Sequence, residues 1–329
     1  MKPTISVALC TYNGEKFLKA QLESILQQSL PVDEIIICDD GSTDKTLDIV
    51  HQVQASTATP IQLYQNSENL GSSRNFEQCV KHCSGDFIFL SDQDDLWKNH
   101  KVERIMQLFH QHKDWMAVFS NAQIINQQGE YLGNTAFDEI EFTEALQENW
   151  KAGQAFHILL RGYVVTGATL AIRKEIVPQV FPTPNLIKEL IHDGWIALFL
   201  SIHQQIGFTN ECLIDYRTHA SQQVGFGKKG KKITLFGRFK RDRTEKLNRI
   251  LPSVKNSAAL YDYFITLPTL PKHIIELLES RKNHFAFRFQ LPENRLMRIL
   301  PILGHVQSGS YAKHEVGKWW RTVLGDLFE

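Results

Sequence analysis

The first hundred residues are dominated by short apolar segments that alternate with helical patterns. Residues 4–9, 34–38, 61–64 and 87–90 are apolar, and most of them are rich in β-branched side chains, as buried strands are. Apolar side chains between these segments recur at spacings of three and four, which predicts amphipathic helices. Strands separated by helices need crossover connections, so the sequence predicts an α/β fold with a mainly parallel sheet flanked by helices.

The strand and helix patterns continue to about residue 225 and then change. Further strands are expected at 116–119 and within 164–172, and an apolar helix at 187–202. Beyond them the chain reads as helical segments broken by prolines, namely Pro252, Pro268, Pro271, Pro292 and Pro301.

These patterns predict two domains. Residues 1–225 are expected to form the α/β domain, with a nucleotide-binding half at 1–105 and an acceptor half at 106–225. Residues 226–329 are expected to form a basic, helical C-terminal region.

The net charge of zero conceals a split between these regions. Residues 228–329 carry 20 Lys and Arg against 9 Asp and Glu, and residues 1–227 carry 16 against 27. A basic run at 228–243 and a last helix at about 316–328, apolar on one face, are typical of a membrane-surface segment. The same helix pattern also fits a helix docked on its own domain.

Location follows from what the sequence lacks. It contains no apolar run of the roughly 18 to 20 residues that a spanning helix needs, and no basic-then-apolar leader. The five cysteines are irregularly spaced and are interpreted as reduced. We therefore expect a cytoplasmic protein, peripheral on the inner face of the cytoplasmic membrane.

Polar residues follow each of the first four predicted strands. They occupy residues 10–15, 39–42, 66–71 and 91–95. In parallel sheets ligands bind beyond the carboxyl ends of the strands, so these four polar ends are expected to converge on one site.

Two of these strand ends carry adjacent carboxylates. Three carboxylates within Asp92-Gln93-Asp94-Asp95 repel one another, which favours a bound cation such as Mg²⁺ or Mn²⁺ between them and a substrate diphosphate. The alternative is that Asp94 or Asp95 caps a helix beginning near Trp97. At Asp39-Asp40-Gly41-Ser42 a carboxylate can accept the imide N–H of uracil or thymine, and the alternative is turn chemistry alone.

At this point the sequence resembles the family 2 glycosyltransferases, which are inverting enzymes with a GT-A fold. The resemblance is carried by motifs that occur in the family's order and spacing, over roughly residues 4–105 and more loosely to 225. The form Asp-Gln-Asp-Asp-Leu-Trp at 92–97 is most similar to the rhamnosyltransferase-like branch of bacterial surface polysaccharide synthesis. These motifs are Thr11-Tyr12-Asn13, Asp39 to Asp44, Asn69-Leu70-Gly71 with Arg74-Asn75, Gly85-Asp86 and Ser91 to Trp97.

The resemblance implies a role for each matching position. Asp94 is implied as the metal ligand, and His219, in Tyr216-Arg217-Thr218-His219, as a second ligand to the metal or diphosphate. The Ser221-Gln222-Gln223 that follows departs from the family's usual Asn residues. The residues implied to bind the nucleotide sugar are Thr11, Tyr12, Asn13, Glu15, Asp39, Asp40, Arg74, Asp92, Gln93 and Gly167.

The resemblance also implies a catalytic base in the second half of the domain. His192-Asp193-Gly194-Trp195 fits that place, with Asp193 at the base position. An N-cap role for Asp193, a structural role for His219 and a packing role for Gly167 remain the alternatives.

Together these features predict an inverting, metal-dependent hexosyltransferase. It is expected to move a sugar from dTDP-rhamnose or a UDP-hexose to a hydroxyl of a glycan or lipid-linked acceptor, with no nucleic-acid partner. The alternatives are a nucleotidyltransferase acting on sugar phosphates and an inactive nucleotide-sugar-binding module. The first of these lacks the Gly-rich basic loop expected after its first strand.

Overall fold

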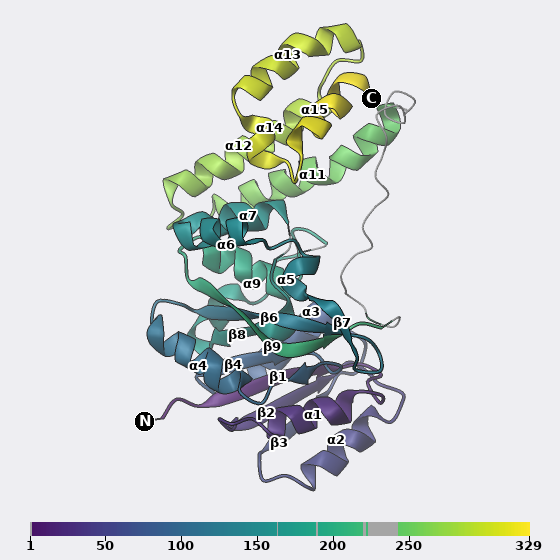
Figure 1. Cartoon of the computed structure of the whole chain (residues 1–329), viewed down its shortest axis with the longest axis vertical. Helices are drawn as coiled ribbons and strands as arrows, with labels where there is room; N and C mark the ends of the chain where they lie inside the picture. The colour runs from purple at the N-terminus through teal and green to yellow at the C-terminus, as the bar shows by residue number, and fades with distance from the viewer. Residues whose placement is uncertain (1, 163, 189, 220–221, 223–242) are drawn as a thin grey trace. The chain divides into compact units, whose positions relative to one another are not determined.

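A computed structural model describes residues 2–162, 164–188, 190–219, 222 and 243–329 of the chain. The described residues form two compact units, coloured along the chain in Figure 1. The first contains those of Met1–Leu159, Tyr163–Pro184 and Glu189–Phe226. The second contains those of Leu160–Gly162, Asn185–Lys188 and Gly227–Glu329.

The described strands of the first unit form one mixed sheet. Its order is β3-β2-β1-β4-β8-β6-β9-β5, with β7 paired to β6. The strands are β1 (Ile5–Thr11), β2 (Glu34–Asp39), β3 (Ile61–Gln65), β4 (Phe87–Ser91), β5 (Leu96–Trp97), β6 (Ala117–Ile125), β7 (Tyr131–Thr135), β8 (Leu170–Arg173) and β9 (Ile206–Arg217).

The parallel part of the sheet is the half that the first hundred residues build. Strands β3, β2, β1 and β4 pair in parallel, and β6 pairs in parallel with β9. Strands β5, β7 and β8 add antiparallel pairings, so the far half of the sheet is mixed. The α/β architecture expected from the sequence is confirmed, and the parallel strands bring the carboxyl ends of β1, β2 and β4 to one edge.

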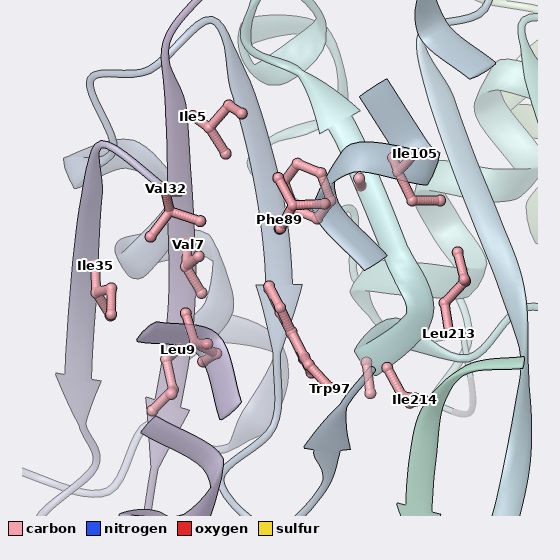
Figure 2. Close-up of a cluster of buried hydrophobic side chains, with 14 of the residues drawn as sticks. Ile5, Val7, Leu9, Val32, Ile35, Phe89, Trp97, Ile105, Leu213 and Ile214 are labelled. Carbon is pink, nitrogen blue, oxygen red and sulfur yellow. The ribbon is translucent and has the colours of Figure 1, made fainter. Parts of the chain in front are cut away.

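Helices cover both faces of this sheet (Figure 1). Alternate side chains of β1 and β4 pack with apolar residues of α1, α2 and α4, and Figure 2 shows this layer around Val7, Leu9, Phe89 and Ile105. Helix α3 packs on β1 and β2. The helices are α1 (Leu18–Leu26), α2 (Thr46–Gln54), α3 (Ser72–His82), α4 (Lys101–Gln111), α5 (Ala136–Glu139), α6 (Glu144–Asn149), α7 (Ala155–Arg161), α8 (Val177–Val180) and α9 (His192–Ser201).

Some boundaries differ from the sequence expectation. The strand expected within 164–172 begins only at Leu170, because Gly167–Thr169 form a short 3-10 turn. Helix α9 begins at His192 rather than at Ile187. Trp97 lies in β5 and the next helix begins at Lys101, so the proposal that Asp94 or Asp95 caps a helix near Trp97 is wrong.

The second unit is helical in its described part. Two of the prolines expected to break helices lie inside them: Pro252 in α11 and Pro301 in α13. The other three, Pro268, Pro271 and Pro292, lie between helices. The helices are α11 (Arg243–Phe264), α12 (Lys272–Phe289), α13 (Arg295–Gln307), α14 (Ser310–His314) and α15 (Trp319–Phe328).

The last helix packs largely on its own unit. Trp319, Val323 and Leu327 of α15 lie against a small core that contains Ile302 and Tyr311. This is the docked arrangement that the sequence left open. The basic run expected at 228–243 lies, except for Arg243, outside the described residues. Among the described helices, none has the length and apolarity needed to span a membrane.

We predict that Gly207→Ala destabilises the first unit by about 1–3 kcal/mol, because a Cβ there overpacks the core. This Cβ would lie 2.1 Å from Cζ3 of Trp115, and the Trp115 ring is also stacked on His112, with ring centroids 3.8 Å apart. Urea unfolding measures the cost. The same substitution in a Trp115→Ala background should cost much less, and an equal cost in both backgrounds would refute the clash.

Candidate active site

A pocket of about 170 Å³ opens at the carboxyl ends of β1, β2 and β4. It gathers residues from loops that lie far apart in the sequence. The lining residues are Cys10, Thr11, Tyr12, Asp40, Ser72, Asn75, Phe76, Asp92, Gln93, Asp94, Thr166, Gly167, Ile191, His192, Asp193, Tyr216, His219 and Gln222.

The acidic loop after β4 forms one wall of the pocket. Its backbone is held by Arg217 at the end of β9, whose Nε donates to the carbonyl oxygen of Asp94 at 2.8 Å. The backbone N–H of Arg217 donates to Oδ1 of Asp95 at 3.0 Å. Arg217 is buried and its guanidinium lies over the ring of Phe17, so this cation fixes the loop rather than facing the pocket.

The carboxylates of this loop repel one another electrostatically. Burial, and then the neighbouring Asp94 and Asp193, raise the pKa of Asp92 to about 7. Burial, Asp94 and Asp92 also raise the pKa of Asp95 well above its ordinary value. Oδ2 of Asp95 is buried and has no hydrogen-bond partner among the described residues. The pocket therefore concentrates negative charge that the protein only partly neutralises.

Lys101 is a buried basic residue, missed by sequence reasoning, that interacts electrostatically with Asp92 and Asp95. Its Nζ donates to the carbonyl oxygen of Ala168 at 2.9 Å and lies 3.7 Å from the ring centre of Trp97. Burial lowers the pKa of Lys101 to about 7, although Asp95 and Asp92 act in the opposite direction. A signal was present in the sequence: Lys101 lies four residues before Ile105, on the apolar face of α4.

Gln93 ties the acidic loop to the loop after β1. Its Oε1 accepts the backbone N–H of Tyr12 at 2.9 Å, and its Nε2 donates to the carbonyl oxygen of Tyr12 at 3.0 Å. A Cβ on Gly14 would lie 2.2 Å from Oε1 of Gln93, so a larger residue there would displace this amide from its hydrogen bonds to Tyr12.

The carboxylates after β2 cross-link the neighbouring strand ends. Asp39 is buried and accepts hydrogen bonds from the hydroxyls of Thr11 and Ser42. Asp40 accepts the backbone N–H groups of Leu70 and Gly71 at 2.8 and 2.9 Å. Only Asp40 of the pair lines the pocket. The turn chemistry that the sequence left open is thus present at Asp39, which bonds Ser42 of its own turn, whereas Asp40 bonds the loop after β3.

Asp193 lies on another wall, in the first turn of α9. Its Oδ2 accepts the backbone N–H of Gly167 at 2.8 Å, and its Oδ1 accepts that of Gly194 at 2.6 Å. A Cβ on Gly167 would lie 3.2 Å from both Oδ2 of Asp193 and Nε2 of His192. The glycine therefore lets these two side chains approach the 3-10 turn before β8.

His192 stacks on Phe76, with ring centroids 4.3 Å apart, beside Asp193. Both of its ring nitrogens are buried without a hydrogen-bond partner among the described residues. Burial lowers the pKa of His192, so the imidazole is neutral at pH 7. A neutral imidazole at this end of the pocket leaves both a donor and an acceptor for a ligand or for water.

His219 contacts the acidic loop directly. Its Nε2 lies 2.7 Å from Oδ2 of Asp94, and its ring lies beside Phe17. The described residues contain no group of three or more His, Cys, Asp or Glu side chains arranged to hold a metal. Asp94 and His219 are a two-residue donor set of oxygen and nitrogen, which fits a divalent cation completed by substrate oxygens.

Four of the residues singled out from the sequence do not line the pocket. Asn13 and Glu15 accept backbone N–H groups of Thr43 and Lys45, and so tie the loop after β1 to the start of α2. The side chain of Arg74 is exposed. The fourth is Asp39, described above. The nine that do line it are Thr11, Tyr12, Asp40, Asp92, Gln93, Asp94, Gly167, Asp193 and His219.

A parallel half-sheet with Asp92 and Asp94 in a pocket at its carboxyl edge is the arrangement of a GT-A fold. The family model "Glycosyl transferase family 2" matches residues 6–181, more than half of the chain. The chain therefore belongs to glycosyl transferase family 2.

Relatives of known sequence agree with this membership. An uncharacterized glycosyltransferase of Nostoc sp., alr2836, is 28% identical over 221 residues, covering 66% of this chain and 65% of that protein. The dTDP-rhamnosyl transferase RfbG of Shigella flexneri is 26% identical over 227 residues, covering 66% of this chain and 73% of that protein. The match with the Nostoc protein thus spans just under two thirds of its length.

Solved structures share the fold. S. aureus TarS 1–349 in complex with UDP-GlcNAc has a TM-score of 0.56 at 14% identity, over 98% of this chain and 89% of that one. The mannosyltransferase PcManGT of Pyrobaculum calidifontis, in complex with GDP-Man and Mn²⁺, has a TM-score of 0.53 at 15% identity, over 99% and 85%. At these identities the likeness concerns the GT-A fold.

The raised pKa of Asp92 gives a prediction about stability in the absence of metal and nucleotide. Because the folded protein holds this proton more tightly than the unfolded chain, stability contributed by Asp92 falls as pH rises from about 4 towards 7. Asp92→Asn should therefore stabilise the protein at pH 8, on the order of 1 kcal/mol or more, and have little effect near pH 4.

Thermal unfolding at the two pH values measures this difference, and Asp48→Asn, at an exposed position of α2, is the matched control. If Asp92→Asn shifts stability equally at both pH values, carboxylate crowding is not the cause.

Proposed function

We propose that this chain is an inverting glycosyltransferase that moves a hexose from a nucleotide-sugar donor to an acceptor hydroxyl. The observation that carries the proposal is the pocket itself, in which Asp92 and Asp94 share one cavity with Asp193. Residues 92–94 and Asp193 are about a hundred positions apart in the sequence, and it is the folding of the chain that brings them into one pocket. Membership of glycosyl transferase family 2 supports the same reaction.

Asp193 is proposed as the general base. An attacking hydroxyl must lose its proton as it bonds to the anomeric carbon, and a fixed carboxylate accepts it. The hydrogen bonds from the backbone of Gly167 and Gly194 hold the Asp193 side chain in one orientation. Attack and departure on opposite faces of the sugar invert the anomeric centre.

The nucleoside diphosphate is proposed to lie along the β1 and β4 ends of the pocket. Thr11, Tyr12 and Asp40 are the proposed nucleoside contacts, with Asp92 facing the ribose and Gln93 shaping the wall. Asp39, Asn13 and Glu15 support these loops through their own hydrogen bonds. Arg74, exposed at the start of α3, remains a proposed contact to the base or a phosphate.

Asp94 and His219 are the proposed ligands of Mg²⁺ or Mn²⁺. When bound, such an ion supplies charge stabilisation to the departing diphosphate, worth several kcal/mol in metal-assisted reactions. The crowded carboxylates and the orphaned Oδ2 of Asp95 support a cation here. The fold neighbour PcManGT was solved with Mn²⁺.

Donor, acceptor and location are proposed from the relatives. RfbG is a dTDP-rhamnosyl transferase, which favours dTDP-rhamnose as donor, with a UDP-hexose as the second candidate. We propose a glycan or lipid-linked saccharide as acceptor, in surface polysaccharide synthesis at the inner face of the cytoplasmic membrane. A nucleotidyltransferase and an inactive binding module are less well supported, because Asp193 lies in the same pocket as the acidic loop.

We predict that Asp193→Asn lowers kcat about 10²- to 10⁴-fold, the range that general-base catalysis contributes, while donor affinity stays within about threefold. The donor is selected by a thermal-shift screen with Mn²⁺ and its affinity is measured by calorimetry. Asp48→Asn serves as the control for an exposed carboxylate. Near-normal turnover of Asp193→Asn with intact donor binding would exclude the base assignment.

We also predict that Asp94→Asn and His219→Ala each weaken the Mn²⁺-dependent part of nucleoside diphosphate binding by at least about tenfold. The two residues touch each other, so the double variant should lose little more than either single one. Titration of UDP or TDP with and without Mn²⁺ measures both effects. If His219→Ala keeps the metal dependence of the unaltered protein, His219 is structural.

A further inference from the structure

Helix α13 in the second unit has an inverted distribution of side chains. It buries the charged Arg298 together with Ile302, and it exposes five large apolar residues. The exposed fractions are 76% at Leu296, 64% at Met297, 41% at Ile299, 79% at Leu300 and 51% at Leu303. Hydrophobic side chains scattered singly on a surface need no explanation, but five on one helix do.

The spacing of these residues places most of them on one side of the helix. Leu296, Ile299, Leu300 and Leu303 follow one another at intervals of three, one and three, which is one stripe of an α-helix. A different side of the helix carries Ile302, which packs with Leu291 and Tyr311 in the core of the second unit. The exposed stripe is therefore a second apolar face on a helix whose first apolar face is already used.

The orientation of α13 is fixed by hydrogen bonds of its buried arginine. Arg298 donates to the carbonyl oxygens of Pro292 and Glu293, and also to those of Asp326 and Glu329 at 3.1 and 2.7 Å. Turning the helix to bury its leucines would break these bonds and leave a buried guanidinium without partners. The apolar stripe is thus held outward by the fold of the unit.

The charged residues in the stretch that carries the stripe, 294–314, are all basic. The sequence has no Asp or Glu from residue 294 to 314, whereas Arg295 and Lys313 are exposed. Over the described residues 243–329 the sequence carries 13 Lys and Arg against 8 Asp and Glu, one of which is the exposed Glu293 just before α13. An apolar stripe in basic surroundings matches an anionic lipid surface.

We propose that the exposed stripe of α13, defined as Leu296, Ile299, Leu300 and Leu303, inserts into the interfacial layer of an anionic lipid bilayer. Thirteen residues make a helix about 20 Å long, too short to cross a bilayer core of about 30 Å, so α13 lies in the membrane plane. A second copy of this chain is a poorer occupant, because a symmetric contact would bring two basic units together.

This assignment relocates the membrane contact expected from the sequence. The last helix, chosen for its apolar spacing, packs Trp319, Val323 and Leu327 on its own unit, whereas α13 supplies the exposed face. Membrane binding through α13 would bring the proposed glycosyltransferase close to a lipid-linked acceptor. Only this biological role rests on the proposed function; the membrane binding itself does not.

The test uses the full chain with vesicles of phosphatidylcholine alone or mixed equally with phosphatidylglycerol. The protein should co-sediment with the mixed vesicles much more than with phosphatidylcholine. Leu300→Glu should weaken this binding more than about tenfold, since it places a charge in the apolar stripe. Leu132→Glu is the matched control, because Leu132 is also an exposed leucine (53%) but lies on β7 of the first unit.

Several results would overturn the inference. They are absence of vesicle binding by the unaltered chain, an equal loss in both variants, or a dimer in light scattering that Leu300→Glu converts to monomer without any vesicle effect. Because Leu300 is exposed, circular dichroism should show unchanged folding. Nucleotide-sugar binding measured without vesicles reports separately on the proposed function, so that either proposal can fail alone.

Discussion

The crowding of carboxylates at the carboxyl edge of the parallel half-sheet is the constraint on which the rest of the site depends. Asp92, Asp94 and Asp95 follow one strand, and Asp193 reaches the same pocket from α9. Negative charges this close resist burial, as the raised pKa values of Asp92 and Asp95 show. Folding the chain in this way costs stability, and the cation and diphosphate that we propose as ligands would recover it.

Two buried basic side chains partly compensate the negative charge of the pocket. Arg217 holds the backbone of the acidic loop, and Lys101 lies buried beneath it with Nζ on the carbonyl oxygen of Ala168. Neither cation neutralises the carboxylates completely, since Oδ2 of Asp95 keeps no partner among the described residues. The loop is therefore held by hydrogen bonds while part of its negative charge stays unneutralised, which is the arrangement that the proposed cation and charge stabilisation require.

The position of the site could largely be predicted from the sequence, because the ends of the buried strands can be recognised in it. Apolar segments followed by polar residues located the edge of the sheet, and Asp92, Asp94 and Asp193 do line one pocket. The direction of individual side chains was less accessible. Asp39 turns inward to Thr11 and Ser42 because the strand ends need cross-links, and nothing in an Asp-Asp pair tells which member does so.

The second unit shows a different limit of sequence reasoning. Helical spacing identified the apolar face of the last helix, α15, but the exposed apolar face of α13 was not predicted from the sequence. The orientation of that face depends on Arg298, whose four carbonyl partners come from residues 292–329 and fix α13 with its leucines outward. Pro252 and Pro301 also lie inside helices, although proline usually ends them.

The most direct test of the central claim is an anomalous difference map from crystals grown with Mn²⁺ and UDP. The account predicts one strong manganese peak within coordination distance of Asp94 and His219, beside the diphosphate. A nucleotide bound in the pocket with no manganese beside Asp94, or manganese bound only elsewhere on the chain, would contradict it.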